Sequence, residues 1–176
     1  MSNHLKSPSD EERESPALTR GEYLKLLRTA RRLGERRSYL LIKLFVTVDL
    51  PLQCLDQITV ELVRQGSGTL QCRGSSIAFC CPAGLQQELL AYIADRSLRH
   101  GPVFLTRGGQ PLNRANIFRK LQKLCQEAGV PEEKGNPRSM HNLYKATQHQ
   151  LDDHLLVLKK QMYDHLLEME QDSIGW

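Results

Sequence analysis

After a polar N-terminal stretch, apolar residues recur along the chain with the spacing of helices. Thr19 and Glu22 have the spacing of a capping box, so a helix is predicted from there to about Leu33. Residues 39–46 are apolar on nearly all sides, which predicts a helix buried in the core. A short helix is expected within residues 49–57.

The pattern then changes to the two-residue alternation of β-strands. Residues 58–65, 69–73 and 76–81 are rich in β-branched and apolar side chains, and the Gly-Ser-Gly sequence at 66–68 separates the first two runs. A glycine-containing break between two such runs is typical of a hairpin. We therefore expect a small antiparallel sheet of three strands.

Helical spacing returns in the second half of the chain. It covers residues 85–98 and, after an extended piece at 103–106, a helix that Asn113 caps and Gly129 ends. From Pro137 the chain has a helical pattern nearly to its end. The predicted fold class is α+β, mostly helical with the small three-stranded sheet.

The last predicted helix carries an apolar stripe, interrupted only by His165 and formed by Leu151, Leu155, Leu158, Met162 and Met169. Packing against the chain's own core is the favoured explanation, and a partner's groove or a second copy of the chain is the alternative. The organisation expected is a disordered acidic leader (1–17), a domain (18–150) and a C-terminal amphipathic helix with a tail (151–176).

Charge is distributed unevenly along the 176 residues, whose formal net charge is +4. Residues 1–16 hold two basic and four acidic residues, whereas 17–45 hold eight basic and two acidic ones. The basic segment suits a polyanion such as DNA, and equally a solvated helix surface. Without an apolar membrane span or signal peptide, we expect a cytoplasmic location and no membrane partner. The five scattered cysteines have neither disulfide nor zinc spacing, and no metal or cofactor is expected.

Four phrases resemble the catalytic domain of the tyrosine recombinases, the phage integrase family. The opening Leu18-Thr19-Arg20-Gly21-Glu22-Tyr23 resembles the family's "LTxxEY", and Ile58-Thr59-Val60-Glu61 resembles the start of its sheet. Residues 103–112 resemble "VFxTxxGxPL", and residues 116–130 resemble the helix that follows it. The resemblance covers residues 18 to about 150 and implies an integrase-like catalytic-domain fold.

The resemblance also implies a chemistry, in which a tyrosine attacks a DNA phosphate while arginines, a lysine and histidine-type residues stabilise the transition state. Pro51 stands where the first arginine of the family's "TGxRxxE" turn is expected, and proline offers no cation. Arg73 is nearest to the family lysine. In the "HxxR" motif Arg138 stands at the histidine position and His141 at the arginine position, and Tyr163 is the sole late candidate nucleophile.

These substitutions predict a DNA-binding domain that is defective in strand cleavage and rejoining. A relic or accessory of a mobile element's DNA-integration machinery would have these properties. Double-stranded DNA is the expected partner, and the candidate phosphate contacts are Arg64, Arg114, Arg119 and Lys120. One alternative is an interaction or dimerisation module that acts through the C-terminal helix. Another is an active recombinase with a substituted pocket, using Tyr163 with Arg73, Arg138 and His141. For Tyr163, a role as a helix-packing aromatic beside Met162, Leu166 and Leu167 is favoured over a catalytic role.

Overall fold

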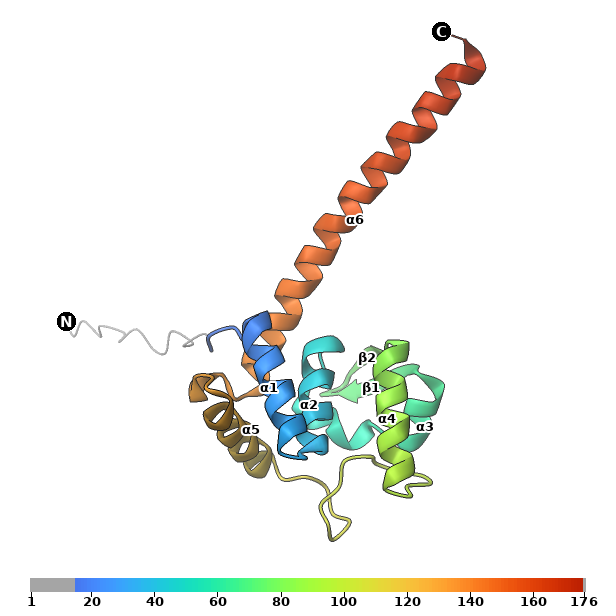
Figure 1. Ribbon diagram of the computed structural model, residues 1–176. Helices are drawn as coiled ribbons and strands as arrows, with labels where there is room; N and C mark the ends of the chain where they lie inside the picture. The colour runs from blue at the N-terminus through green and yellow to red at the C-terminus, as the bar shows by residue number, and fades with distance from the viewer. Residues whose placement is uncertain (1–14, 176) are drawn as a thin grey trace, which may run out of the picture.

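A computed structural model describes residues 15–175 of the chain. The described part contains six α-helices, two β-strands and two short 3₁₀ helices, η1 and η2 (Figure 1). In chain order they are α1 (Arg20–Arg32), α2 (Arg36–Thr47), η1 (Leu52–Gln57), α3 (Val60–Gln65), β1 (Ser67–Cys72), β2 (Ser75–Cys80), α4 (Ala83–Asp95), α5 (Arg114–Ala128), η2 (Glu132–Lys134) and α6 (Pro137–Ile174). Of the predicted leader, residues 1–14 lie outside the described residues.

The capping box at the start of α1 is confirmed. Thr19 Oγ1 accepts from the Glu22 backbone N–H at 3.2 Å, and the Glu22 carboxylate accepts from the Thr19 N–H at 3.1 Å. The buried helix is confirmed as α2, which contacts α1, α4 and α6 and so forms the centre of the body. Its side chains Ile42, Leu44 and Phe45 are at most 1% exposed. The sequence thus places the core around α2.

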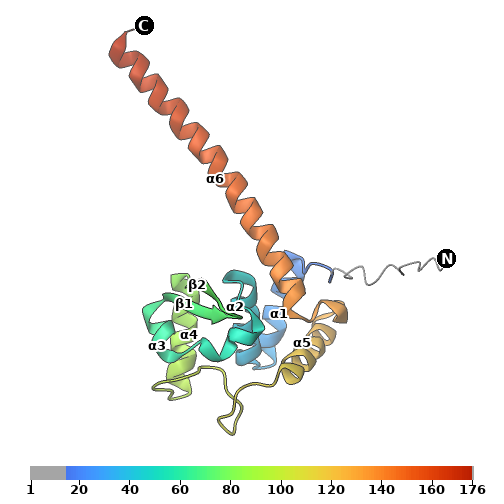
Figure 2. The ribbon, with the colours of Figure 1, turned by 180° about the vertical axis from the view of Figure 1, so that it is seen from behind.

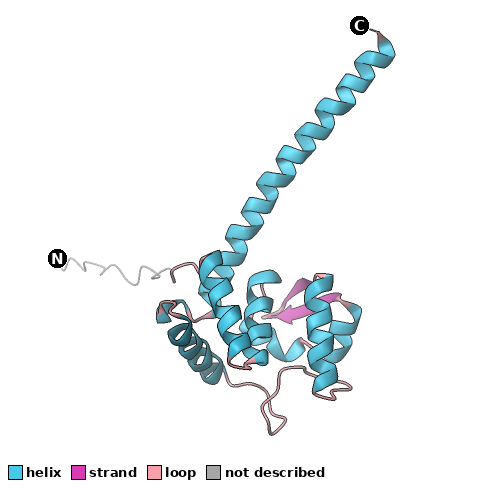
Figure 3. Ribbon diagram, viewed as in Figure 1, coloured by secondary structure: helices cyan, strands magenta, loops and turns pink. Residues whose placement is uncertain are grey.

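The sheet has two strands in the described chain, so the expectation of three is wrong (Figure 3). Strands β1 and β2 pair antiparallel from Ser67 opposite Cys80 to Cys72 opposite Ser75. Arg73 (φ 48°) and Gly74 (φ 79°) connect them, and two residues with positive φ are typical of a tight hairpin turn. The hairpin therefore turns at residues 73–74, not at 66–68.

The residues predicted as the first strand form helix α3 instead. Thr59 Oγ1 accepts from the Leu62 N–H at 3.1 Å, and Gly66 ends the helix in the left-handed conformation with φ 77°. Val60 and Val63, three residues apart, are both fully buried on one face. Cap residues at both ends and this burial outweigh the β-propensity of the valines.

Extended chain joins α4 to α5 and lies against the start of α3. The Val103 N–H donates to the Ile58 carbonyl at 2.9 Å, and Phe104 is buried to 1% exposure. The predicted extended piece at 103–106 is thereby confirmed, and Asn113 caps α5 through the Ala115 N–H at 2.8 Å. This segment borders the cavity described below.

Helix α6 is continuous over 38 residues and projects from the body, as both views show (Figures 1 and 2). Its first turns pack into the body through Met140 and Leu143, whereas every residue from His149 to Gly175 is exposed. The expectation that its stripe packs on the chain's own core is therefore wrong. The helical spacing identifies an apolar face but not what covers it. Among the described helices, none is long and apolar enough to cross a membrane.

Candidate nucleic-acid interface

The turn between α2 and η1 contains Pro51, the position at which the resemblance predicts the first family arginine. Pro51 stands there with φ −65° as the residue before η1, and it makes no side-chain cap. Two residues earlier, where the family turn has glycine, Asp49 adopts φ 53°. The backbone thus keeps a left-handed conformation that glycine favours and aspartate tolerates. Asp49 therefore places a carboxylate two residues before Pro51.

That carboxylate contacts the second motif. Asp49 Oδ1 lies within hydrogen-bond distance of His141 Nδ1, although 92 residues separate the two in sequence. The His141 and Asp49 side chains are 37% and 34% exposed, and the imidazole stacks against Tyr144 with ring centroids 6.4 Å apart. One nitrogen of His141 is therefore engaged by an anion. An acceptor in this place opposes binding of a phosphate, which needs donors.

The glutamate position of the same turn holds Cys54. Its side chain is buried, and the thiol donates to the Gln71 carbonyl at 3.6 Å. Burial, together with the neighbouring Cys72 thiol, raises the pKa of Cys54 to about 11. The thiol is therefore neutral at physiological pH and supplies no charge to the turn.

On its other side the same segment meets the β-hairpin. Gln53 Nε2 contacts Cys72 Sγ at 3.1 Å, so η1 lies directly against the end of β1. The next residue, Arg73, is exposed at the tip of the hairpin. The segment from Asp49 to Gln53 therefore lies between His141 of α6 and the hairpin that carries Arg73.

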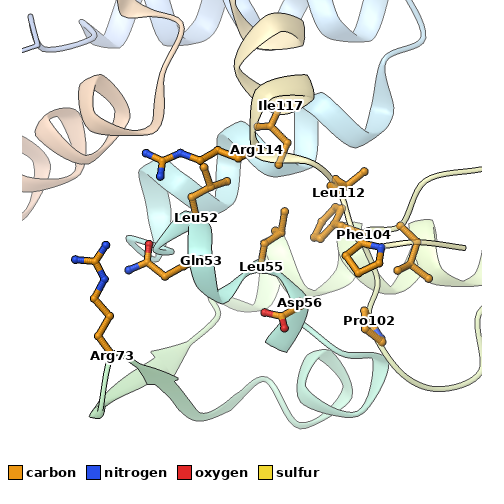
Figure 4. A pocket seen from close by; sticks show the side chains of 12 residues that line it. Leu52, Gln53, Leu55, Asp56, Arg73, Pro102, Phe104, Leu112, Arg114 and Ile117 are labelled. Carbon is orange, nitrogen blue, oxygen red and sulfur yellow. The ribbon is translucent and has the colours of Figure 1, made fainter.

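A cavity of about 300 Å³ opens beside this segment. Figure 4 shows Arg73 and Arg114 reaching its rim from separate elements, with Gln53 between them. Its inner wall is apolar, with Leu55 and Phe104 among the lining residues, and Asp56 is the one acidic residue in the lining. Two cations at the mouth of an otherwise apolar hollow are able to hold an anion at the surface.

Arg114 owes its position to the start of α5, which Asn113 caps. The guanidinium also lies over the Phe118 ring, 5.5 Å from its centroid, and this cation–π contact orients it. Since Arg114 is in the first turn of α5, the helix N-terminus adds a positive field beside it. A basic residue in the first turn does not stabilise the helix, because its charge has the same sign as the helix N-terminus.

The remaining predicted residues are spread over the body. Arg64 is exposed at the end of α3, Arg119 is exposed on α5, and Arg138 is exposed in the first turn of α6. Lys120 forms an ion pair with Glu35 at 3.2 Å, which offsets part of its charge. Neither Arg138 nor His141 lines the cavity that Arg73 and Arg114 share. The four predicted catalytic residues do not line one cavity.

Tyr163 lies far from the other candidates. It is 66% exposed on the projecting part of α6, so its ring is not packed into the body of the chain. Because α6 is continuous, the 22 residues between His141 and Tyr163 separate them by about 33 Å at 1.5 Å per residue. Within one chain, the phenol does not reach the turn at Pro51.

No protein-family model and no curated protein sequence matches the chain. Among solved structures, XerA recombinase superposes with a TM-score of 0.63 at 13% identity, over 73% of this chain and 48% of its own. XerH site-specific recombinase bound to difH substrate, a pre-cleavage complex, superposes with a TM-score of 0.64 at 18% identity. The match covers 81% of this chain and 45% of the XerH chain. The post-cleavage complex of XerH with palindromic difH substrate superposes with a TM-score of 0.67 at 17% identity. This match covers 87% of this chain and 47% of the XerH chain.

The chain has a recombinase-like fold. It spans less than half the length of each of these recombinases. At 13–18% identity the likeness concerns the fold, and the roles of individual side chains are argued from their own geometry. In residues 15–175 no three His, Cys, Asp or Glu side chains gather as a metal site would require.

Sequence reasoning missed two features of this candidate site. The sequence placed Arg114 among the general phosphate contacts and did not pair it with Arg73. The two arginines are 41 positions apart, and only the fold brings them to one cavity. Sequence reasoning also gave Asp49 no role. A signal for Asp49 was present in the resemblance, since an acidic residue stands at the glycine position of the family turn.

Proposed function

We propose that this chain is a recombinase-like domain that binds double-stranded DNA and lacks strand cleavage and rejoining. The observation that carries the proposal is the pair of exposed arginines, Arg73 and Arg114, at one cavity of a recombinase-like fold. Phosphate contacts supply most of the affinity of such interfaces, and they do not require the residues of a cleavage site. Arg64, Arg119 and Arg138 are exposed and add further contacts in this proposal.

The proposed loss of cleavage follows from charge. Phosphoryl transfer builds negative charge on nonbridging oxygens, and fixed cations must meet it. Here Pro51 offers no donor, Asp49 brings a carboxylate to His141, and Cys54 is a neutral thiol. Arg73 binds phosphate as a cation, but its guanidinium is a poor proton donor to a leaving group.

The test is duplex binding measured by fluorescence anisotropy over a series of salt concentrations. Each phosphate contact contributes about 0.9 to the slope of log K against log salt, so Arg73→Ala with Arg114→Ala should lower the slope by about two. The matched control replaces Arg28 and Arg32, which are exposed on α1 outside the cavity. Affinity that does not change with salt, or equal losses in both double variants, would refute the proposal.

A second candidate function is that of an interaction module which acts through α6. The specific observation in its favour is the exposed apolar face of that helix, on which Leu158 is 53% and Met162 67% exposed. Contiguous exposed apolar surface marks interaction sites. Sedimentation of the whole chain beside a version ending at Gln150 tests this function, because an unchanged monomer in both removes self-association.

A further inference from the structure

The projecting part of α6 exposes a regular apolar stripe that no other described residue covers. Leu155 and Leu158 are 54% and 53% exposed, and Met162 is 67% exposed. Helices without tertiary packing are marginal in water, and most helical stability in proteins comes from burying an apolar face. A helix of this length therefore gains stability from a partner along its stripe.

The stripe has the spacing of a coiled-coil seam. Starting at Leu151, steps of four and three residues alternate through Leu155, Leu158, Met162, His165 and Met169. This pattern repeats every 3.5 residues on average, which keeps one face of a helix turned toward a partner helix. The stripe therefore fits another long helix and not a globular groove.

We propose that the occupant is a second copy of this chain, with the two α6 helices antiparallel about an axis beside Lys160. This inference rests on the second candidate function. In this register two residues face each other across the pair when their sequence numbers add to 320. Every residue of the apolar stripe then faces another residue of the stripe. The layers, each occurring twice by symmetry, are Leu151 against Met169, Leu155 against His165, and Leu158 against Met162.

The length of the projecting segment fits the same register. The part of α6 in which every residue is exposed begins at His149, about one turn beyond Lys145. Gly175, the last described residue, faces Lys145 across the pair. In this register each helix end lies beside Lys145 of the other helix, near the point where α6 leaves the globular body in a single chain (Figure 1). The bodies lie at opposite ends of the paired helices.

Charge selects the antiparallel orientation. The C-terminal half of the segment carries four carboxylates, on Asp164, Glu168, Glu170 and Asp172, and no lysine or arginine follows Lys160. A parallel pair would place these acidic halves side by side, which is unfavourable. The antiparallel pair instead places each beside a half that carries Lys145, Lys159 and Lys160 as well as Asp152 and Asp153. Lys159 lies near its own copy at the axis, where its long side chain extends into solvent.

Sedimentation equilibrium of the full chain tests the pairing. The expected species has twice the chain mass of 20.1 kDa at micromolar concentration. Leu155→Asp with Leu158→Asp should sediment as a monomer. The matched control, Leu156→Asp with Leu167→Asp, places the same charges on the opposite face and should remain a dimer. A monomeric wild type, or a control that dissociates equally, would overturn the inference. Circular dichroism verifies that both variants keep the folded body.

Pulsed electron paramagnetic resonance tests the orientation. A spin label at Ile174→Cys, in a Cys72→Ser and Cys80→Ser background, marks the end of each helix. The antiparallel register places the two labels 28 residues apart along the axis, or about 42 Å. A parallel pair would place them about 10 Å apart and would overturn the inference while leaving the second candidate function intact. Neither measurement involves DNA, so failure of DNA binding is distinguished from failure of pairing.

Discussion

The ion pair between Glu22 and Lys134 holds together elements that are distant in sequence. Lys134 Nζ donates to Glu22 Oε1 at 2.7 Å, and the two side chains are only 15% and 16% exposed. The pair joins the start of α1 to η2, which leads directly into α6 and its residues Arg138 and His141. Glu22→Gln removes the charge but keeps an oxygen that can accept from the Thr19 N–H.

The size of the effect follows from this burial. A hydrogen bond to a charged group contributes about 1.5–3 kcal/mol, and the variant leaves the Lys134 ammonium without its anion in a poorly solvated place. We expect Glu22→Gln to lower the free energy of unfolding by about 2 kcal/mol, or Tm by about 4–8 °C in a domain of this size. The exposed Glu127 on α5 provides the control, and Glu127→Gln should change stability by less than about 0.5 kcal/mol.

The pH dependence supplies a check on the cause. Burial opposes ionisation of Glu22, but hydrogen bonds from Lys134 and Thr19 hold its pKa below the ordinary value. A carboxylate with a lowered pKa in the folded state stabilises the protein above its unfolded pKa, and this stability is lost as pH falls through the folded value. Urea unfolding followed by circular dichroism should show the full difference between wild type and Glu22→Gln at pH 7. The difference should shrink below about pH 4.

A difference that stays constant between pH 7 and pH 3 would refute the electrostatic explanation. So would a double-mutant cycle with Lys134→Met in which the two changes are additive, because paired charges must show coupling.

Three further outcomes are expected. Gly135→Ala would place a Cβ 3.0 Å from the Gln122 backbone, and it should lower the free energy of unfolding measured in urea by about 1–3 kcal/mol. Gly84→Ala, in open space within α4, should instead raise it by about 0.5–1 kcal/mol. Asp49→Asn should tighten duplex binding and steepen its salt slope by up to about one, and unchanged anisotropy curves would contradict the charge argument. Iodoacetamide at pH 8 should label the exposed Cys80 well before Cys125, whose pKa burial raises to about 11, and mass spectrometry showing equal rates would count against the buried site.

Local chemistry explains what the sequence predicted well. The caps at Thr19 and Asn113 and the apolar run of α2 are short-range signals, and each gives the helix that it predicts. Residues 58–65 show the limit of such signals. Their β-branched residues favour a strand, but the Thr59 cap and Gly66 make a helix whose valines pack on the core.

The site required long-range information that no local pattern contains. The empty arginine position at Pro51 follows from the resemblance alone, whereas the contact of Asp49 with His141 joins residues 92 apart. The cavity shared by Arg73 and Arg114 likewise depends on the fold. For α6 the sequence predicts the helix and its apolar stripe, but periodicity does not distinguish a core from a partner.

The measurement that most directly tests the central claim, DNA binding without cleavage, uses a pool of nicked duplexes with randomised central positions. A native gel should show bound DNA, and a denaturing gel of the same reaction should show no covalent protein–DNA product, because the charge stabilisation needed at the phosphate is missing. A product that survives denaturation and disappears in Tyr163→Phe would contradict the claim, since it would prove that the phenol reaches a working site.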